Sequence, residues 1–191
     1  METWDYPALN STVHVALLDG VRDAKRLRSR LVAAAAMQGA EGETEREAIN
    51  FAFIEAPLIA STLHLQTALL YALLAVAGDT LRTKTVHSEI LWALNPTNNI
   101  SEAIRRFGVS DGSTRLLALR VVDTSKETFA VTDAENAIRA AVSGNLVPLS
   151  RLEEFSDWTA LRKYYKVPVD LPRRRQVEII VSTVATKAAA A

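Results

Sequence analysis

The stretch TKTVHSEILWALNPTNNISEAIRRFGV, which runs from Thr83 to Val109, predicts two short helices joined by a polar elbow. Ile90, Leu91 and Leu94 recur at the spacing of one helical face, so the first helix has a side that can be buried. Pro96 ends this helix, because proline lacks the N–H that a further turn needs and disfavours helical backbone in the residue before it.

The second helix of this stretch has its own start and stop signals. Asn99 is expected to cap its first turn, and Glu102 is placed so that its carboxylate can reach back to the N–H of Asn99. Gly108 is expected to end the helix in a left-handed conformation. The apolar side comprises Ile100, Ala103, Ile104 and Phe107, and the solvent side comprises Arg105 and Arg106.

The whole chain predicts a single α+β domain over residues 1–191, with a small, mostly antiparallel or mixed sheet of three to four strands covered by helices. The near-continuous apolar character of residues 115–122 favours a central strand. Pro148 allows only an edge strand, because it cannot donate to a neighbour. The expected strands lie near residues 13–18, 50–54, 116–122 and 146–149, and Thr132 or Asp133 is expected to cap a helix that ends near Val142.

Two contrasting segments follow the first strand. Asp23 is expected to start a helix that ends near Ala36, with Arg22, Arg26 and Arg30 stacked on one face. That arginine row is either a solvated face or a surface for RNA or a partner. Residues 37–49 are rich in Gly and Glu without an apolar period, which predicts a mobile loop.

The segment from Leu58 to Ala77 is apolar and close to the length of a membrane span. Polar residues such as His64 and Thr67 interrupt it, and no aromatic belt flanks it. It is therefore predicted to be a helix of the core, opened by Pro57, and no membrane partner is expected.

The last predicted helix follows three arginines at 173–175. Its apolar residues repeat at i, i+3, i+4 and i+7, which indicates one buried or docking stripe. The stripe consists of Val177, Ile180, Val181 and Val184. Residues 188–191 are expected to form a frayed tail.

Composition excludes several classes of function. Apolar residues make up 49% of the 191 residues and charged residues 23%, as in ordinary globular domains. Lys+Arg and Asp+Glu both number 22, so any contact with RNA has to come from a local basic patch. The absence of cysteine excludes disulfides, cysteine-based metal sites and thiol catalysis. The first residues lack the pattern of a secretory signal.

No set of catalytic residues stands out in the sequence. His14, His64 and His87 lie in different elements without a second ligand at metal spacing, so each is expected to be structural. The fingerprints of P-loop, dinucleotide-binding, hydrolase and zinc-protease sites are absent. We therefore predict a non-enzyme with no catalytic residue, metal or cofactor.

The elbow is the candidate binding site. Backbone N–H groups at the start of its second helix lack partners, and the helix dipole is positive there. Asn98 and Asn99 add side-chain donors. Arg82 and Lys84 lie just upstream, and such a group can hold a phosphate or a single-stranded RNA end. The alternative is that Asn99 and Glu102 only cap one another and the basic residues are solvated.

Several ordered motifs in and around the elbow carry a family resemblance. They are His87-Ser88-Glu89-Ile90, Leu94-Asn95-Pro96, Asn98-Asn99-Ile100-Ser101-Glu102-Ala103-Ile104 and Phe107-Gly108-Val109. Together they closely resemble the TPRKB family, the kinase-binding subunit of the KEOPS complex, also called EKC. Weaker similarity extends to residues 21–24, 161–167 and 177–187, and leaves out roughly 36–49 and 124–129.

The resemblance implies a concrete function. KEOPS places a threonylcarbamoyl group on the adenosine beside the anticodon of certain tRNAs. A separate metal-dependent transferase subunit performs that chemistry, and a small atypical kinase/ATPase binds the transferase. Members of the family bind the kinase directly, contact the transferase only through the complex, and help recruit tRNA by its 3′ end. The resemblance also implies a location in nucleus and cytoplasm and a link to telomere maintenance.

Carried over by position, the resemblance assigns residues to two surfaces. The tRNA-facing candidates are Arg82, Lys84, Asn98, Asn99, Arg105 and Arg106, and the kinase-facing candidates are Val177, Ile180, Val181 and Val184. The chain departs from the family at Asn95, where serine is common, and in a longer segment at 38–47. Two rival functions remain: an enzyme that binds a small molecule between the long helix and the elbow, and a protein adaptor without RNA contact.

Overall fold

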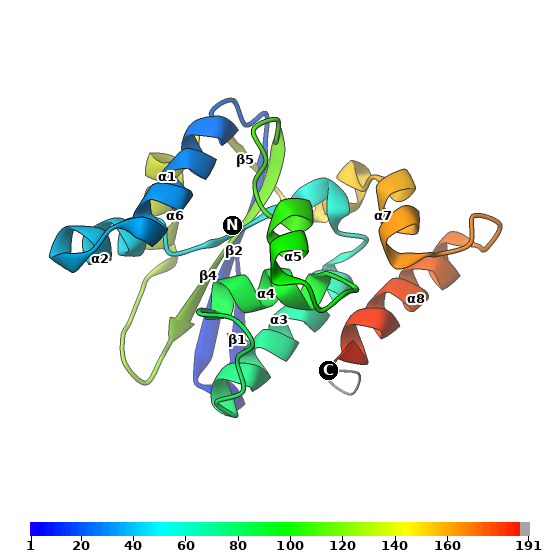
Figure 1. Cartoon of the computed structure of the whole chain (residues 1–191), viewed down its shortest axis with the longest axis horizontal. Coiled ribbons are helices and arrows are strands. Elements are labelled where there is room, and N and C mark those ends of the chain that lie inside the picture. Colours follow the sequence, from blue (N-terminus) through cyan, green and yellow to red (C-terminus); the bar gives the residue numbers. More distant parts are fainter. Residues whose placement is uncertain (188–191) are drawn as a thin grey trace. The chain divides into compact units, whose positions relative to one another are not determined.

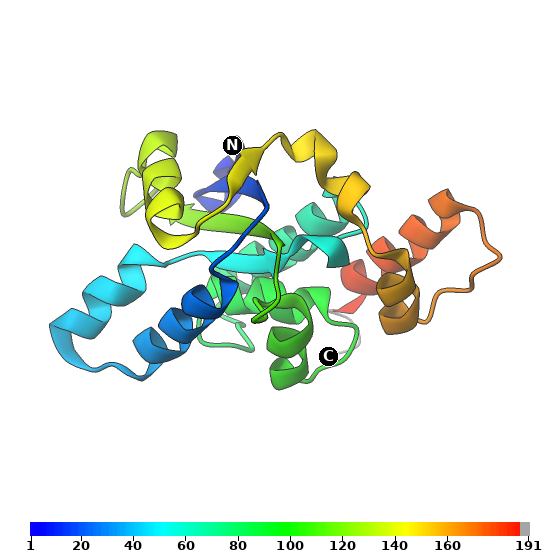
Figure 2. The ribbon, with the colours of Figure 1, turned by 90° about the horizontal axis from the view of Figure 1, so that it is seen from above.

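The computed structural model describes residues 1–187. The chain divides into two compact units, which Figures 1 and 2 show in two views. The first unit combines residues 1–54 with 109–149 and contains the sheet. The second unit combines residues 55–108 with the segment that begins at Ser150, and this unit is helical.

The sheet of the first unit is built on its two longest strands. β2 (Ser11–Asp19) and β4 (Arg115–Asp123) pair antiparallel along their whole length, so that His14 lies opposite Arg120. The strand order is β1-β2-β4-β3, and the short β5 also pairs antiparallel with β2. The remaining strands are β1 (Glu2–Tyr6), β3 (Ala52–Glu55) and β5 (Asn145–Val147).

The α+β class, the central position of β4 and all expected strands are confirmed. The described residues contain five strands rather than three to four, because β1 was not predicted. β1 pairs with β2 in register from Glu2 to Tyr6 but has no buried residue, so it lacks the apolar alternation that reveals a strand.

One face of the sheet packs against the helices of the first unit. Alternate strand residues contribute to this core, since side chains on a strand point to opposite faces in turn. The helices are α1 (Ala24–Ala36), α2 (Gly39–Ala48) and α6 (Val131–Ala141). The core includes Ala16, Leu18, Leu27, Ala34, Phe51, Phe53, Leu116, Ala118 and Ile138.

The prediction of a loop over residues 37–49 is wrong, because α2 occupies most of this segment. Tertiary contacts hold this polar helix against α1. Arg30 donates to Glu45, with Nη2 to Oε2 at 3.0 Å, and Arg46 donates to the carbonyl of Met37 at 2.9 Å. A Cβ at Gly42 would lie 2.8 Å from that carbonyl oxygen, so the glycine permits the close approach.

Arg120 interrupts the apolar run of β4 and is the largest fully buried side chain of the protein's described part. Its guanidinium donates to Glu47 and, at 3.2 Å, to the carbonyl of Asn50, and it pairs with Glu127 at 3.5 Å. It also lies 4.5 Å from the ring centre of Phe129. The buried charge is thus compensated by acids and by a ring.

The second unit is an assembly of helices around α3. In the described residues its α-helices are α3 (Thr62–Ala77), α4 (Val86–Leu94), α5 (Ile100–Phe107), α7 (Trp158–Tyr165) and α8 (Arg173–Ala185). The 3-10 helices η2 (Ala56–Leu58) and η3 (Leu149–Phe155) precede α3 and α7. Across the described residues, no helix is both long and apolar enough to cross a bilayer.

Three helix starts differ from the prediction. α3 begins at Thr62 rather than near Leu58, because the side chain of Ser61 accepts the N–H of His64 at 3.2 Å and so caps it. The arginines expected before α8 form its first turn. α6 begins after Ala130 without a side-chain cap, although Thr132 or Asp133 was expected there. The tail at 188–191 lies outside the described residues.

A buried hydrogen-bonded chain joins three elements of the second unit. Nδ1 of His64 accepts the N–H of Ala60 at 3.2 Å, so Nε2 carries the proton and donates to the hydroxyl of Tyr165 at 2.9 Å. Tyr165 in turn donates to the carbonyl of Leu94 at the end of α4. Burial lowers the pKa of His64 to about 3 and raises that of Tyr165, so both groups are neutral and structural, as predicted for His64.

Candidate functional site

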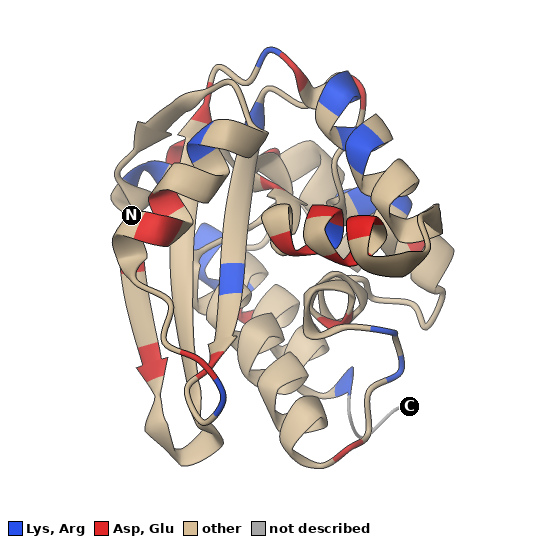
Figure 3. Ribbon diagram, turned by 90° about the vertical axis from the view of Figure 1, so that its left-hand side faces the viewer, with Lys and Arg blue, Asp and Glu red and all other residues tan. Residues whose placement is uncertain are grey.

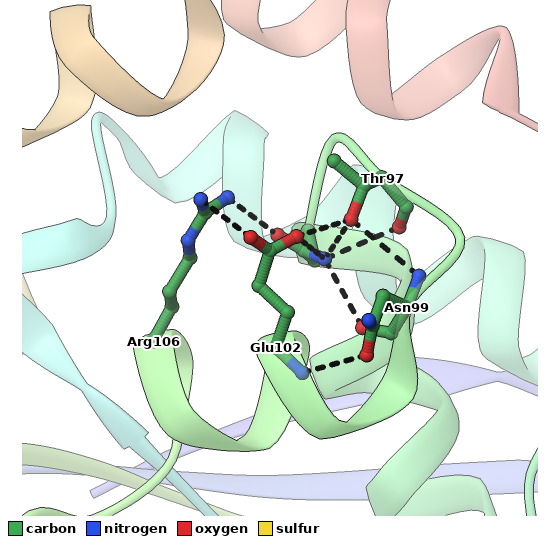
Figure 4. Close-up of polar contacts among 5 residues, drawn as sticks. Thr97, Asn99, Glu102 and Arg106 are labelled. Carbon is green, nitrogen blue, oxygen red and sulfur yellow. Dashed lines mark hydrogen bonds and ion pairs between the residues drawn. The ribbon is translucent and has the colours of Figure 1, made fainter.

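The cap of α5 is confirmed, with one change of partner. Asn99 Oδ1 accepts the N–H of Glu102 at 3.0 Å, which satisfies one free donor of the first turn. The carboxylate of Glu102 does not return to the N–H of Asn99; it accepts from the hydroxyl of Thr97, as Figure 4 shows. The expected reciprocal capping box is therefore wrong in its second half, because Thr97 lies between the two groups.

Gly108 ends α5, but not in the expected left-handed conformation. Its φ is −80° and its ψ is 174°, so it is extended. A Cβ at this position would lie 2.5 Å from the carbonyl oxygen of Ile104. The glycine is therefore required for a close backbone approach and not for its access to positive φ.

Asn95 is the buried centre of the elbow. Its Nδ2 donates to the Thr97 hydroxyl at 2.8 Å and to the carbonyl of Asn99 at 3.3 Å. Its Oδ1 accepts from Nη1 of Arg106 at 3.2 Å. The amide both donates and accepts, so one side chain joins the end of α4 to both ends of α5.

Lys187 closes the carboxyl end of α4, a role that sequence reasoning missed. Its ammonium donates to the carbonyls of Trp92, Asn95 and Thr97, the last at 3.0 Å. It also lies 3.6 Å from the ring centre of Trp92. A cation is favoured at a helix carboxyl end, and burial lowers the pKa of this lysine to about 8. The only signal in the sequence is an isolated lysine after an apolar helix.

Arg82 and Asn98 are brought together by Trp92. The guanidinium of Arg82 lies 5.9 Å from the centre of the Trp92 ring, and the indole N–H donates to the carbonyl of Asn98 at 3.3 Å. The buried Glu89 accepts the backbone N–H groups of Arg82 and Thr83 and so fixes the segment before α4. The side chains of Arg82 and Asn98 are exposed.

The two arginines of α5 differ in their partners within the protein, and therefore in their availability for a ligand. Arg106 pairs with Glu102 at 2.7 Å and stacks 4.6 Å from the ring centre of Tyr164. Hydrogen bonds from Thr97, then from Asn95, and the charge of Arg106 lower the pKa of Glu102, so the pair stays ionised. Arg105 is exposed and forms no ion pair with the described residues. Lys84 is also exposed.

The kinase-facing candidates divide into two classes. Ile180 and Val184 are fully buried in the second unit, where α8 packs against α3, so they belong to its core. Val177 and Val181 are half-buried. The proposed contact with a kinase stays a prediction.

The outer face of α3 offers an apolar surface that sequence reasoning missed. Leu63, Leu70 and Leu74 are 57%, 42% and 53% exposed. They occur at i, i+7 and i+11, which places them on one side of the helix. The uniformly apolar sequence of α3 conceals which side is exposed. We call these three residues the α3 leucine row.

Two observations bear on the rival hypothesis of an enzyme that binds a small molecule. Residues 1–187 contain no group of three or more His, Cys, Asp or Glu side chains placed to hold a metal. A hollow in the first unit lies between α1 and α2 and is lined by Ala33, Met37, Ala40, Glu41, Thr44 and Glu45. Its position is not the one expected between the long helix and the elbow.

Comparison with known proteins identifies the class of this chain. A family model described as kinase binding protein CGI-121 matches residues 18–188. The EKC/KEOPS complex subunit CGI121 of Cryptococcus neoformans is 33% identical, and the match covers 98% of this chain and 99% of that protein. The subunit of the same name from Aspergillus fumigatus is 31% identical over 94% of this chain and 93% of its own length. The chain therefore belongs to the CGI-121 family of kinase-binding proteins, which confirms the resemblance.

Proposed function

We propose that this chain is a non-catalytic subunit of a KEOPS/EKC complex. It binds and regulates the small atypical kinase of the complex and helps recruit tRNA by its 3′ end for threonylcarbamoylation beside the anticodon. The transferase subunit is reached through the kinase. The observation that carries this proposal is the match to kinase-binding relatives over nearly the whole chain. We extend it to a location in nucleus and cytoplasm and to a role in telomere maintenance.

The kinase is proposed to dock on α3 and α8. Val177 and Val181 on α8 are partly accessible, and the α3 leucine row adds exposed apolar surface on a helix that α8 packs against. Apolar rows of this kind on a protein surface mark contacts with partners. α3 carries no charged residue from Thr62 to Ala77, so it can be covered without removing a charge from water.

Co-purification with the kinase tests this docking surface. The double substitution Leu70→Arg and Leu74→Arg should reduce recovery of the kinase at least about tenfold, since it places charges at an apolar contact. The control is Val32→Arg on α1, because Val32 is an apolar residue of the first unit that is even more exposed, at 65%. Both variants should keep the circular dichroism spectrum of the wild type.

Substitution Val181→Arg separates the two helices. Loss of the kinase in this variant alone places the contact on α8, and loss in the leucine-row variant alone places it on α3. Unchanged recovery in both, with wild-type binding intact, overturns the surface but leaves the function standing. Absence of any kinase complex with the wild-type chain overturns the function.

The charge of the elbow favours a subunit that contacts RNA over a pure protein adaptor. The exposed cations Arg82, Lys84 and Arg105 form no ion pair within the described residues, although the charge of Glu102 acts on Arg105 as well as on Arg106. An exposed positive surface beside Asn98 can take phosphate oxygens. A neutral elbow would have favoured the adaptor.

The chain alone should neither hydrolyse nucleotide nor transfer a threonylcarbamoyl group. Release of inorganic phosphate and modification of tRNA can be assayed with the purified chain, before and after the kinase and transferase are added. Turnover by the chain itself, after contaminating kinase has been excluded, would contradict a non-catalytic role.

A further inference from the structure

The second unit holds a concentration of positive charge away from the elbow. From Trp158 to Gln176 the sequence contains six Lys and Arg residues and a single acidic residue, Asp170, although the whole chain has a formal net charge of zero. This segment comprises α7, the connecting loop and the first turn of α8, which are neighbours in both Figure 1 and Figure 2. Four of the six cations, Arg162, Lys163, Lys166 and Arg173, form no ion pair within the described residues, and we call them the α7–α8 basic patch.

The other two cations of this segment, Arg174 and Arg175, form ion pairs, although they lie in the same helical turn as Arg173. Arg174 and Arg175 both donate to Glu178, at 3.1 and 2.5 Å. Arg173 instead lies over Trp158, with its guanidinium carbon 3.6 Å from the ring centre. The ring orients the guanidinium without cancelling its charge, because its π face is only a weak counter-charge.

Arg162 on α7 lies near enough to Arg173 on α8 for its positive charge to act on that guanidinium. Partial burial, and after it the charge of Arg162, lowers the pKa of Arg173. Arg162 follows Trp158 by four residues on α7, so both project from the same side of that helix. No acidic residue lies in the first turn of α8. Two like charges therefore lie near one tryptophan, and neither forms an ion pair within the described residues.

Helix stability does not account for this arrangement. Arg173 occupies the first position of α8, where the helix dipole disfavours a cation. Arg162 and Lys163 are favourably placed in the last turn of α7, but they raise the positive potential at Arg173. An external anion relieves the repulsion between Arg162 and Arg173, and a guanidinium held flat can receive a phosphate through two N–H groups at once.

The patch also continues towards the elbow. Tyr164 of α7 lies beneath the guanidinium of Arg106 on α5, at 4.6 Å, and 6.5 Å from the ring centre of Phe107. α5 and α7 are therefore direct neighbours. The surface thus repeats one unit, an arginine on an aromatic ring, first at Arg106–Tyr164 and again at Arg173–Trp158.

We propose that the α7–α8 basic patch is a second RNA-binding surface that contacts the phosphate backbone of the tRNA whose 3′ end the elbow receives. The inference rests on the proposed tRNA function. Alternating arginines and aromatic rings suit a nucleic-acid strand, since arginine binds phosphate and the planar groups can stack with bases. An acidic protein surface would need the charges but not the rings.

Binding of a labelled tRNA transcript to the full chain, measured by fluorescence anisotropy at several salt concentrations, tests the proposal. The double substitution Arg162→Gln and Arg173→Gln should weaken binding roughly fivefold and reduce the slope of log K against log salt by about 1.4, or about 0.7 for each lost single-strand phosphate contact. Lys163→Glu with Lys166→Glu, on exposed lysines, should weaken binding at least as much.

The matched control removes the same charge from the first unit. Arg22 and Lys25 are exposed and form no ion pair within residues 1–187, and no cation–π contact of either is recorded there. Arg22→Gln with Lys25→Gln should weaken binding less than about twofold. Equal losses in the patch and control variants would show that only net charge matters and would overturn the proposal.

Two other results also decide against the patch. If the patch variants bind tRNA as the wild type does but no longer co-purify with the kinase, the surface is a protein interface. If the wild type binds tRNA and loses it only when Lys84 and Arg105 are changed, the patch fails while the proposed function stands. Failure of the wild type to bind tRNA, alone or with the kinase, overturns both.

Discussion

The two units of the protein treat their cations differently. The first unit neutralises basic side chains with carboxylates, and Figure 3 shows the two signs close together on its elements. The second unit forms some ion pairs but also lays cations on aromatic rings. Those cations are Arg82, Arg106, Arg151, Arg173 and Lys187. Arg106 and Arg151 also pair with carboxylates, and in the first unit Arg120 has both kinds of partner.

The difference matters because the two kinds of contact leave different fields. A carboxylate cancels the charge of its partner, whereas a ring positions a cation and leaves most of its charge. A chain of zero formal charge can therefore present a positive surface without an excess of basic residues. This comparison predicts that cation substitutions act mainly on stability in the first unit and on binding in the second.

The largest expected effect is at Arg120, the buried cation of the first unit. Arg120→Ala should reduce the free energy of unfolding by about 3 kcal/mol, since it removes a packed side chain and its pairs. Glu47 and Glu127 are 58% and 46% exposed in their side chains, so they can regain water and the loss falls at the low end for a buried pair. Urea denaturation measures it.

The control for Arg120 is an arginine of the same unit on the surface. Arg139 pairs with Glu135 one helical turn away at 2.7 Å and is largely exposed. Arg139→Ala should cost less than about 0.5 kcal/mol. Similar losses at the two positions would contradict a central role for the buried charge.

The second unit buries a neutral histidine, His64, in addition to the charged Glu89 and Lys187. Burial lowers the pKa of His64 to about 3, against an ordinary value of 6.5. As pH falls below about 6.5, the unfolded chain takes up a proton that the folded chain refuses, so stability is lost down to about pH 3. Between pH 7 and pH 5, His64 should lower the free energy of unfolding by about 2 kcal/mol.

Substitution His64→Gln tests this pH dependence without relying on absolute stability. Glutamine can still accept and donate, but it does not titrate in this range. The difference in unfolding free energy between pH 7 and pH 5 should therefore shrink by about 2 kcal/mol in the variant. An unchanged difference would mean that His64 accepts a proton in the folded chain.

The sequence predicted best where local signals sufficed. Asn99 as a cap and Pro96 as a stop depend on neighbours within a few residues, so the elbow was placed correctly. The apolar runs of the two long strands β2 and β4 were sufficient to predict them. The class of protein followed from the ordered motifs of the elbow.

Some failures involve partners that are distant in sequence, whereas others, such as the conformation of Gly108 and the partner of Glu102, are local. α2 has a weak local signal and is held by Arg30 of α1, and Lys187 caps a helix that ends 93 residues earlier, at Leu94. The α8 stripe was correctly seen as one helical face, but whether Ile180 meets α3 or a partner cannot be known before the helices are packed. The apolar pattern of the sequence identifies the buried face of a helix, but only the packed structure shows which element covers that face.

Substitution of two basic residues at the elbow should reduce the free energy of tRNA binding by about 1.4 kcal/mol. Lys84→Glu with Arg105→Glu should weaken tRNA binding at least about tenfold, since both side chains are exposed and Arg105 has no carboxylate partner among the described residues. The kinase complex should remain intact. Removal of the single-stranded 3′ end from the tRNA should weaken wild-type binding by a similar factor. If trimming that end changes nothing, the elbow is not an RNA site and the adaptor function becomes the better account.

The smallest expected effect separates two neighbouring asparagines that the sequence assigned to one task. Asn99 uses its side chain to cap α5, so Asn99→Ala should cost about 1 kcal/mol of unfolding free energy. Asn98 is exposed and uses only its carbonyl, as acceptor for Trp92, so Asn98→Ala should leave stability within about 0.3 kcal/mol of the wild type.

The same pair should respond in the opposite order to RNA. Within the described residues the side-chain amide of Asn98, beside Arg82, forms no hydrogen bond, so Asn98→Ala should weaken tRNA binding by roughly twofold to threefold. Asn99→Ala should weaken it less while the chain stays folded. Both quantities can be measured on the same preparations, by thermal unfolding and by anisotropy. Suppose instead that Asn99→Ala weakens tRNA binding more than Asn98→Ala does, at a temperature where both variants are fully folded. The RNA then contacts the capped start of α5, and the donors there matter more than the exposed side chains around Trp92.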